Sequence, residues 1–215
     1  MTADAGEAAR PPILILDLGN VVAFFDHRQA CRQLAALATT GATPIDVYDQ
    51  IFGGSLEEDF DCGRLMTPAF IARLRDALHI VAPDDAIAVA WSDIFRPNDD
   101  VVSILPLLKR STSKLVLASN TNDLHYRWLA RRMGESFACF DEFVLSFQSG
   151  VRKPAPAFFQ HCVEAAGVSP RECVYVDDRE DFVEVATAMG MTGRVYEPAV
   201  GFVSLLAEAG IRLQS

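Results

Sequence analysis

ILILD, residues 13–17, is a run of four aliphatic residues that ends in an aspartate. Two later runs have a similar form, KLVLAS at 114–119 and CVYVDD at 173–178, and shorter ones occur at 143–146 (FVLS) and 194–196 (RVY). The longer runs are rich in Val, Ile and Leu and lack the alternation of a strand with one exposed face. They are typical of strands buried on both faces of a parallel sheet.

Helical patterns separate these predicted strands. Residues 122–133, 155–167 and 180–189 have apolar positions at helical spacing, and the second of them begins after Pro154 and ends at Gly167. A proline at the start and a glycine at the end are typical helix boundaries. Strands that alternate with helices predict an α/β fold with a doubly wound parallel sheet, a Rossmann-like core.

The stretch 27–98 departs from this alternation, because it contains helical patterns but no convincing strand. One helix is predicted to begin at Thr67-Pro68, with threonine as the cap, and another to cover 84–95. We therefore predict a small all-helical cap at 27–98. It is inserted after the first strand into a core of residues 13–26 and 99–215.

Composition restricts the class of protein. The 215 residues are 50% hydrophobic and carry a net charge of −10, without a cluster of Lys or Arg, so a nucleic-acid partner is not expected. The apolar run at 13–16 is too short for a signal peptide or a membrane span. Five scattered cysteines fit a reducing compartment. We expect a cytoplasmic protein without membrane association and with a flexible tail at 1–12. The sequence gives no indication of its oligomeric state.

Polar residues stand at the ends of the three long runs: Asp17, Ser119-Asn120 and Asp177-Asp178. Ligands of open α/β sheets bind beyond the carboxyl ends of the strands, so these residues are expected to meet at one edge. Carboxylates that lie close together repel one another unless they are protonated or neutralised by a cation. Such an oxygen-rich site suits Mg²⁺, which takes one or two carboxylates and leaves room for water and a substrate phosphate.

This set of groups predicts phosphoryl chemistry. A carboxylate beside a metal ion is a candidate nucleophile for phosphorus and forms an acyl phosphate. Ser119 and Asn120 are candidate donors to the phosphoryl oxygens, and Lys153 is a candidate to balance the developing charge. The neighbouring Arg152 is expected to be a surface charge.

Four ordered motifs resemble those of the haloacid dehalogenase superfamily of hydrolases. They are Asp17-Leu-Gly-Asn-Val, Ser119-Asn-Thr-Asn, Lys153-Pro154 and Asp177-Asp178. Many members of this superfamily insert a helical cap after the first motif, where this chain has its helical stretch. Together with His125, the same motifs resemble most closely the bacterial α-glucose-1-phosphate phosphatase group.

The resemblance implies Asp17 and Lys153 as catalytic residues, with Asp17 as the nucleophile. The implied Mg²⁺ ligands are Asp17, the backbone carbonyl of Gly19, Asp178 as the main acidic ligand and Asp177 as a second acidic group. The implied phosphoryl-binding residues are Ser119, Asn120 and Lys153.

The sequence departs from the superfamily pattern at two positions. The acid/base aspartate that normally follows the nucleophile by two residues is Gly19 here. An anomeric leaving oxygen is less basic than an ordinary alkoxide and needs protonation less, which offers a physical reason for the glycine. Phe182 stands where related sequences often have asparagine, and Asp181 is a candidate to supply the missing polar group.

Three further residues are candidate substrate contacts: His27 and Arg28, which begin the predicted cap, and His125, which follows the second motif.

The favoured function is a Mg²⁺-dependent phosphatase that hydrolyses a small phosphate ester, a sugar phosphate, through a phosphoaspartate on Asp17. One alternative is a catalytically degenerate protein that binds a phosphate ligand or a protein partner. The other is a metal-independent haloacid dehalogenase, which Asp177-Asp178 argues against.

Overall fold

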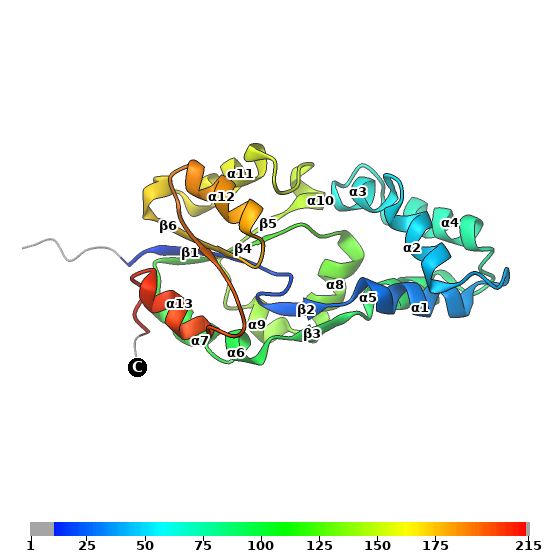
Figure 1. The fold of residues 1–215 in the computed structure, drawn as a ribbon, viewed down its shortest axis with the longest axis horizontal. Helices are drawn as coiled ribbons and strands as arrows, with labels where there is room; N and C mark the ends of the chain where they lie inside the picture. Colours follow the sequence, from blue (N-terminus) through cyan, green and yellow to red (C-terminus); the bar gives the residue numbers. More distant parts are fainter. Residues whose placement is uncertain (1–10, 214–215) are drawn as a thin grey trace, which may run out of the picture.

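A five-stranded parallel sheet forms the centre of the protein, seen in a computed structural model that describes residues 11–213 (Figure 1). The strand order is β5-β4-β1-β6-β7. The strands are β1 (Ile13–Asp17), β4 (Lys114–Ser119), β5 (Glu142–Leu145), β6 (Cys173–Asp177) and β7 (Thr192–Val195). All five strands predicted from the sequence are confirmed, with ends that shift by one or two residues.

The central strand β1 is buried on both faces. Leu14 and Leu16 pack into the apolar cluster on one side of the sheet, and Ile13 and Ile15 pack into the cluster on the other side. This two-sided burial is why the run ILIL has no polar alternation.

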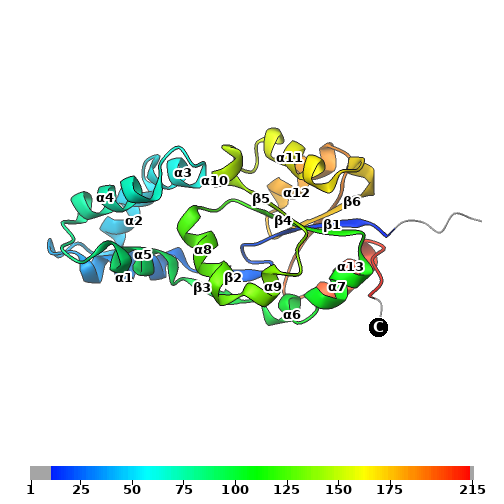
Figure 2. The same ribbon diagram turned by 180° about the vertical axis from the view of Figure 1, so that it is seen from behind.

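Helices cover both faces of the sheet (Figures 1 and 2). One face is covered by α11 (Pro156–Ala166) and α12 (Glu180–Ala188), which follow α10 (Ser146–Ser149) and the short 3₁₀ helix Pro170–Glu172. The other face is covered by α6 (Asp99–Val102), α7 (Leu105–Ser111), α8 (Asp123–Arg132), α9 (Gly134–Phe137) and α13 (Phe202–Glu208). The three helices predicted between strands are confirmed as α8, α11 and α12.

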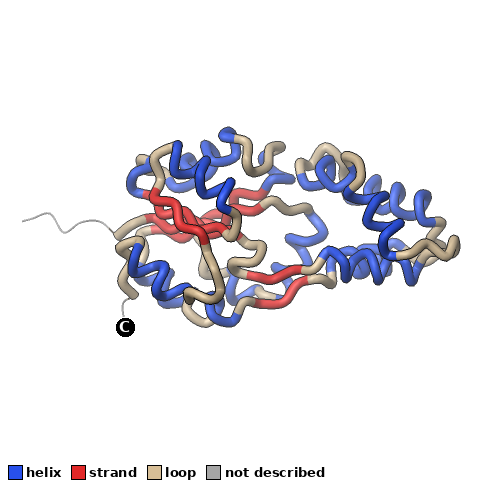
Figure 3. Tube along the Cα trace, in the orientation of Figure 1, coloured by secondary structure: helices blue, strands red, loops and turns tan. Residues whose placement is uncertain are grey.

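A separate group of helices, which we call the helical insert, lies beyond one end of the sheet (Figure 3). They are α1 (His27–Leu37), α2 (Pro44–Phe52), α3 (Leu56–Asp61), α4 (Thr67–Leu78) and α5 (Asp84–Ser92). The helical insert has an apolar core of its own, centred on Trp91, Phe60 and Phe70. The N-terminus of α2 is held by a capping box between Thr43 and Asp46.

Two details of the predicted cap are wrong. Thr67 is the first residue of α4 rather than its cap, and its hydroxyl instead donates to Asp123 Oδ2 of α8 at 2.7 Å. The helix predicted over 84–95 ends at Ser92, because the chain then enters a short strand, β3 (Phe95–Pro97), which pairs antiparallel with β2 (Ala23–Phe25). Three residues are too few to show a strand period in the sequence.

The two short strands connect the helical insert to the sheet, and the guanidinium of Arg96 lies 4.4 Å from the centre of the Phe24 ring.

Of the predicted tail, residues 1–10 lie outside the part of the chain that the structure describes, and Pro11-Pro12 has no regular secondary structure. Within residues 11–213, none of the helices combines the length and the apolar character needed to cross a membrane.

Candidate active site

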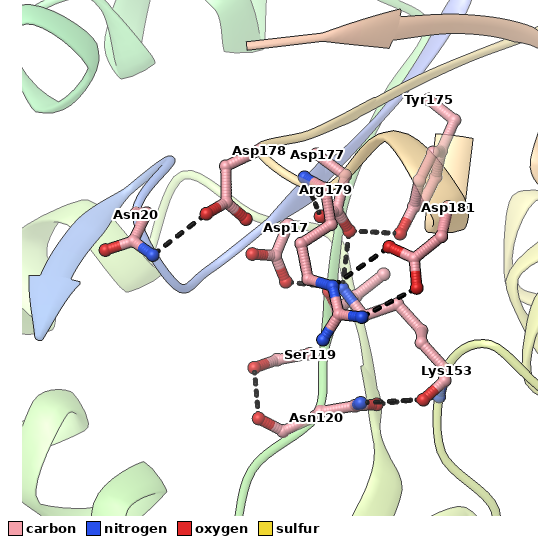
Figure 4. Close-up of polar contacts among 11 residues, drawn as sticks. Asp17, Asn20, Ser119, Asn120, Lys153, Tyr175, Asp177, Asp178, Arg179 and Asp181 are labelled. Atoms are coloured by element: carbon pink, nitrogen blue, oxygen red, sulfur yellow. Dashed lines mark hydrogen bonds and ion pairs between the residues drawn. The ribbon is translucent and has the colours of Figure 1, made fainter. Parts of the chain in front are cut away.

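Two neighbouring strands, β1 and β6, bring three carboxylates to one edge of the sheet. Asp17 is the last residue of β1 and Asp177 the last of β6, and Asp178 follows directly. One carboxylate oxygen from each of these residues lies within 4.8 Å of the other two. Figure 4 shows the three side chains converging beside Lys153. The meeting of strand ends that the sequence predicts is therefore present.

Lys153 is the cation of this cluster. Its Nζ donates to Asp17 Oδ1 at 2.5 Å, to Asp177 Oδ2 at 2.7 Å and to the carbonyl oxygen of Ala118 at 3.2 Å. The side chain is buried, and burial by itself favours a neutral amine. The charges of Asp17 and Asp177 outweigh this effect and raise the pKa of Lys153, so the side chain is an ammonium ion at neutral pH.

Asn120 holds the loop that carries this lysine. Its Nδ2 donates to the carbonyl oxygen of Lys153 at 3.0 Å, and its Oδ1 accepts from the Lys153 backbone N–H at 2.8 Å. Asn120 therefore fixes the position of the lysine backbone, a task the sequence does not reveal. The hydroxyl of Ser119, at the end of β4, donates to the carbonyl oxygen of Asn120 at 3.3 Å.

The two acids that follow β6 have different surroundings. Asp177 is fully buried, and it accepts from Lys153, from the Tyr175 hydroxyl at 2.6 Å and from the backbone N–H of Arg179 at 3.0 Å. Asp178 is half-buried and lines the cleft described below. Asp178 Oδ2 accepts from Asn20 Nδ2 at 2.9 Å, while burial raises the pKa of the Asp178 carboxyl.

Asn20 was not predicted as a site residue. It has a φ of 56°, in the left-handed region where asparagine is enriched among residues with side chains, and this turn directs its amide towards Asp178 (Figure 4). Asn20 directly follows the Asp17-Leu-Gly stretch, but this position indicates a site residue only when the conformation of the turn is known.

The surroundings of Asp17 strongly perturb the pKa of its carboxyl. Burial, together with the charges of Asp177 and Asp178, raises the pKa of Asp17 to about 8, although Lys153 opposes the shift. Three carboxylates facing one ammonium leave an excess of negative charge. An all-oxygen donor set with such an excess fits Mg²⁺, and a divalent cation held there would favour the ionised form of Asp17.

A cleft of about 200 Å³ opens at this edge of the sheet. Its lining includes Asp17, Gly19, Asn20, Ser119, Asn120, Lys153, Asp178 and Phe182 from the core, and His27, Glu57, Asp61 and Trp91 from the helical insert. The cleft is therefore bounded by both parts of the chain.

Gly19 leaves little room for a side chain. A Cβ atom at this position would lie 2.8 Å from Cε1 of Phe25, so the phenyl ring occupies the space that a side chain would need. The sequence has no acid at residue 19, and a side chain there would require the Phe25 ring to move.

The predicted substrate contacts divide into three cases. His27 lines the cleft, and its ring stacks on Phe52 with centroids 4.9 Å apart. Arg28 lies exposed in the first turn of α1 and is not among the residues that line the cleft, so its contact with a substrate stays a prediction. His125 lines the cleft but is buried and stacked on Trp91.

Hydrogen bonds fix the state of His125. Its Nε2 lies 3.2 Å from the Trp91 carbonyl oxygen, which can only accept, and its Nδ1 lies 3.1 Å from Asn122 Nδ2, which can only donate. Nε2 therefore carries the proton. Burial and the nearby His27 lower the pKa of His125 to about 3, so the ring is neutral near pH 7.

Two expectations about residues near the fourth motif and Lys153 are also wrong. Arg152 is not a surface charge: it is partly buried, lines the cleft and pairs with Glu57 of α3 at 3.1 Å. Asp181 does not replace a missing polar group in the cleft, because it is exposed and paired with Arg179 at 2.6 Å. The ring of Phe182 instead packs beneath two cations, with Lys153 Nζ 5.2 Å from its centroid.

Comparison with known proteins identifies similar sequences and folds over most of the chain. Residues 15–190 match the haloacid dehalogenase-like hydrolase family. D-ribitol-5-phosphate phosphatase from Bacteroides thetaiotaomicron is 25% identical over 195 residues, which cover 87% of this chain and 92% of that protein.

Two solved structures illustrate the shared fold. A haloacid dehalogenase family enzyme from the same organism, in complex with magnesium and inorganic phosphate, has a TM-score of 0.75 at 24% identity, covering 87% of this chain and 94% of that one. L-2-haloacid dehalogenase from Xanthobacter autotrophicus has a TM-score of 0.56 at 18% identity, covering 84% and 75%.

Proposed function

The chain belongs to the haloacid dehalogenase-like hydrolases, and we propose that it is a Mg²⁺-dependent phosphatase of a small phosphate ester that works through a phosphoaspartate on Asp17. One observation carries this proposal: Asp17, Asp177 and Asp178 converge on the buried ammonium group of Lys153 at the floor of a cleft. We propose Asp17, the carbonyl of Gly19 and Asp178 as the groups that hold Mg²⁺, with Asp177 as a second acidic group. The bound ion supplies positive charge that offsets the repulsion between the nucleophile and the phosphate.

The side chain of Asp17 is arranged for attack. Lys153 holds Oδ1, while no group among residues 11–213 donates a hydrogen bond to Oδ2. In the first step the Asp17 carboxylate forms a bond to phosphorus as the ester P–O bond breaks. Water then cleaves the acyl phosphate, which releases inorganic phosphate and restores the carboxylate. Lys153, Ser119 and Asn120 are the residues proposed to stabilise the charge on the phosphoryl oxygens.

The packing around Gly19 bears on the choice of substrate. Without an acid at this position, the departing oxygen must leave with little help from the protein, which favours leaving groups of low basicity. The anomeric oxygen of a sugar 1-phosphate is one such group. The relationship to D-ribitol-5-phosphate phosphatase also supports a phosphate ester of a sugar or sugar alcohol. The first ground favours a sugar 1-phosphate and the second a sugar-alcohol phosphate, whose departing primary alkoxide is more basic. We therefore propose the class of sugar phosphates and include both kinds of ester in the panel below.

The helical insert is proposed to act as a cap, with 27–98 as the cap and 13–26 with 99–215 as the core. It contributes His27, Glu57, Asp61 and Trp91 to the wall of the cleft, which supports a role in enclosing the substrate.

Phosphate release tests the proposal. Purified protein is assayed with glucose 1-phosphate, ribitol 5-phosphate and other metabolite phosphates, in Mg²⁺ or in EDTA, and compared with Asp17→Asn. We expect turnover that requires both Mg²⁺ and the Asp17 carboxylate. Folded, Mg²⁺-loaded protein that releases no phosphate from the panel contradicts the proposal, and halide release from a 2-haloacid would then establish dehalogenation instead.

A further inference from the structure

A second group of polar side chains lines the cleft on the side of the helical insert. Glu57 and Asp61 lie one turn apart on α3, and both reach the cleft. Asp61 is only 5% exposed, and its Oδ1 accepts from Nδ2 of Asn122 on the core at 3.0 Å. Glu57 Oε2 accepts from Nη1 of Arg152 at 3.1 Å. Two carboxyls that could have faced solvent are thus held inside the cleft by groups of the core.

The charges of this group nearly cancel. Burial, followed by the negative charge of Glu57, raises the pKa of Asp61 well above its usual range. A protonated Asp61 is neutral, and the remaining charge of Glu57 is matched by the guanidinium of Arg152. The group therefore presents hydrogen-bond donors and acceptors side by side, with almost no net charge.

The wall beside this group is aromatic. The rings of His27 and Trp91 both line the cleft, and they lie nearly parallel, at 11° with centroids 6.2 Å apart. Burial lowers the pKa of His27, which favours its neutral form. Such a wall accommodates a carbon skeleton but offers no charge to bind an ionic one.

We propose that Glu57, Asp61 and Arg152 determine specificity by binding the hydroxyl groups of a neutral polyol or sugar leaving group. A hydroxyl both donates and accepts, so it matches a site that offers both kinds of partner at once. A cationic amine would meet the guanidinium, and a second anion would meet Glu57. The inference rests on the proposed phosphatase activity and adds the residues that select the leaving group.

Substrate comparison tests this role. We would measure kcat/KM for sorbitol 6-phosphate, for phenyl phosphate, whose leaving group has no aliphatic hydroxyl, and for phosphocholine, whose leaving group is cationic. The proteins are wild type, Glu57→Gln and Asp61→Asn. Glu58→Gln is the matched control, because Glu58 lies on the same helix but pairs with Arg64 at the surface.

We expect the ratio of kcat/KM for sorbitol 6-phosphate to that for phenyl phosphate to fall about tenfold or more in Glu57→Gln, as for a lost charge-assisted hydrogen bond. The ratio should also fall in Asp61→Asn, but less, because a neutral carboxyl is replaced there by a neutral amide. Glu58→Gln should leave the ratio unchanged. An equal loss on both substrates, or no loss on either, overturns the inference while the phosphatase activity stands. Wild-type preference for phosphocholine over sorbitol 6-phosphate overturns it too. If wild type hydrolyses none of the three esters nor the wider panel, the proposed function itself fails.

Protein stability is measured alongside by urea unfolding. Asp61→Asn removes a buried acid. If this variant is poorly folded, Glu57→Gln still tests the proposal, because Glu57 is less buried than Asp61. Inhibition by free sorbitol gives a second reading: we expect it in wild type and expect it to weaken in Glu57→Gln, while equal inhibition of both proteins contradicts the assignment.

Discussion

Protonation of His125 is expected to weaken the contact between the helical insert and the core. The ring joins the two parts, because it lies on α8 of the core, donates to the Trp91 carbonyl of α5 and accepts from Asn122, which in turn donates to Asp61 of α3. An imidazolium would carry a proton on Nδ1 that faces the amide N–H of Asn122, so one hydrogen bond would be replaced by a repulsive contact.

The size of this effect follows from the two pKa values of His125. An unfolded histidine has a pKa of about 6.5, whereas burial lowers the pKa of His125 in the folded protein to about 3. Between these values the unfolded chain binds a proton that the folded chain does not. Stability is therefore complete above the unfolded pKa and is lost as the pH falls. At pH 5 the protonation of this one residue favours unfolding by about 2 kcal/mol.

Urea unfolding at pH 7.5 and pH 5, followed by tryptophan fluorescence, measures this term in wild type and His125→Gln. Glutamine keeps a donor for the Trp91 carbonyl but does not titrate. The raised pKa values of Asp17 and Asp61 act in the opposite direction, since their stabilising protonation is lost as the pH rises, but both proteins contain them. We expect the stability advantage of wild type over the variant to shrink by about 2 kcal/mol from pH 7.5 to pH 5. A change below about 0.5 kcal/mol would refute the assignment of a neutral, buried His125.

Three further outcomes are expected. Gly63→Ala should lower the melting temperature more than Gly41→Ala. Both glycines have a positive φ, but only at Gly63 would the new Cβ lie 2.2 Å from a backbone oxygen, that of Phe147. Equal shifts in melting temperature would contradict this clash. Lys153→Met should lower the free energy of unfolding by about 3–5 kcal/mol in urea, because it leaves buried carboxylates without their cation. Added Mg²⁺ should restore part of this stability. A variant that is as stable as wild type without metal would contradict the prediction. Millimolar Mg²⁺ should raise the melting temperature of wild type but not of Asp178→Asn, as followed by differential scanning fluorimetry, and an equal rise would remove Asp178 from the proposed ligands.

The strands and their terminal acids could be predicted because they depend on local sequence. A strand buried on both faces needs an unbroken apolar run, as in residues 13–16, and the first polar residue after such a run marks the edge of the sheet. The sequence alone therefore predicts that Asp17 and Asp177 lie at one edge of the sheet.

Contacts that depend on the placement of the helical insert could not be predicted. Arg152 has no feature in sequence that separates it from a solvated loop residue, and its partner Glu57 lies 95 positions away. Thr67 has the position of a helix cap, but the proximity of Asp123 gives its hydroxyl another partner. Arg28 is predicted to contact the substrate because it follows the first motif and begins the cap. It lies exposed on α1, since neighbours on a helix point about 100° apart and His27 takes the position that faces the cleft.

The order of strands in the sheet has a consequence for synthesis of the chain. β1 leaves the ribosome first, yet both strands that flank it, β4 and β6, are made only after the helical insert is complete. The apolar core of the insert is built from residues between 30 and 94, so it can form while β1 still has no neighbour. During that interval ILIL is an unpaired aliphatic strand that precedes a folded insert, a form prone to aggregation. Messages truncated between codons 98 and 113 would release chains in this state, and Asp17, which is made before the helical insert, reaches its final surroundings only when β6 is added.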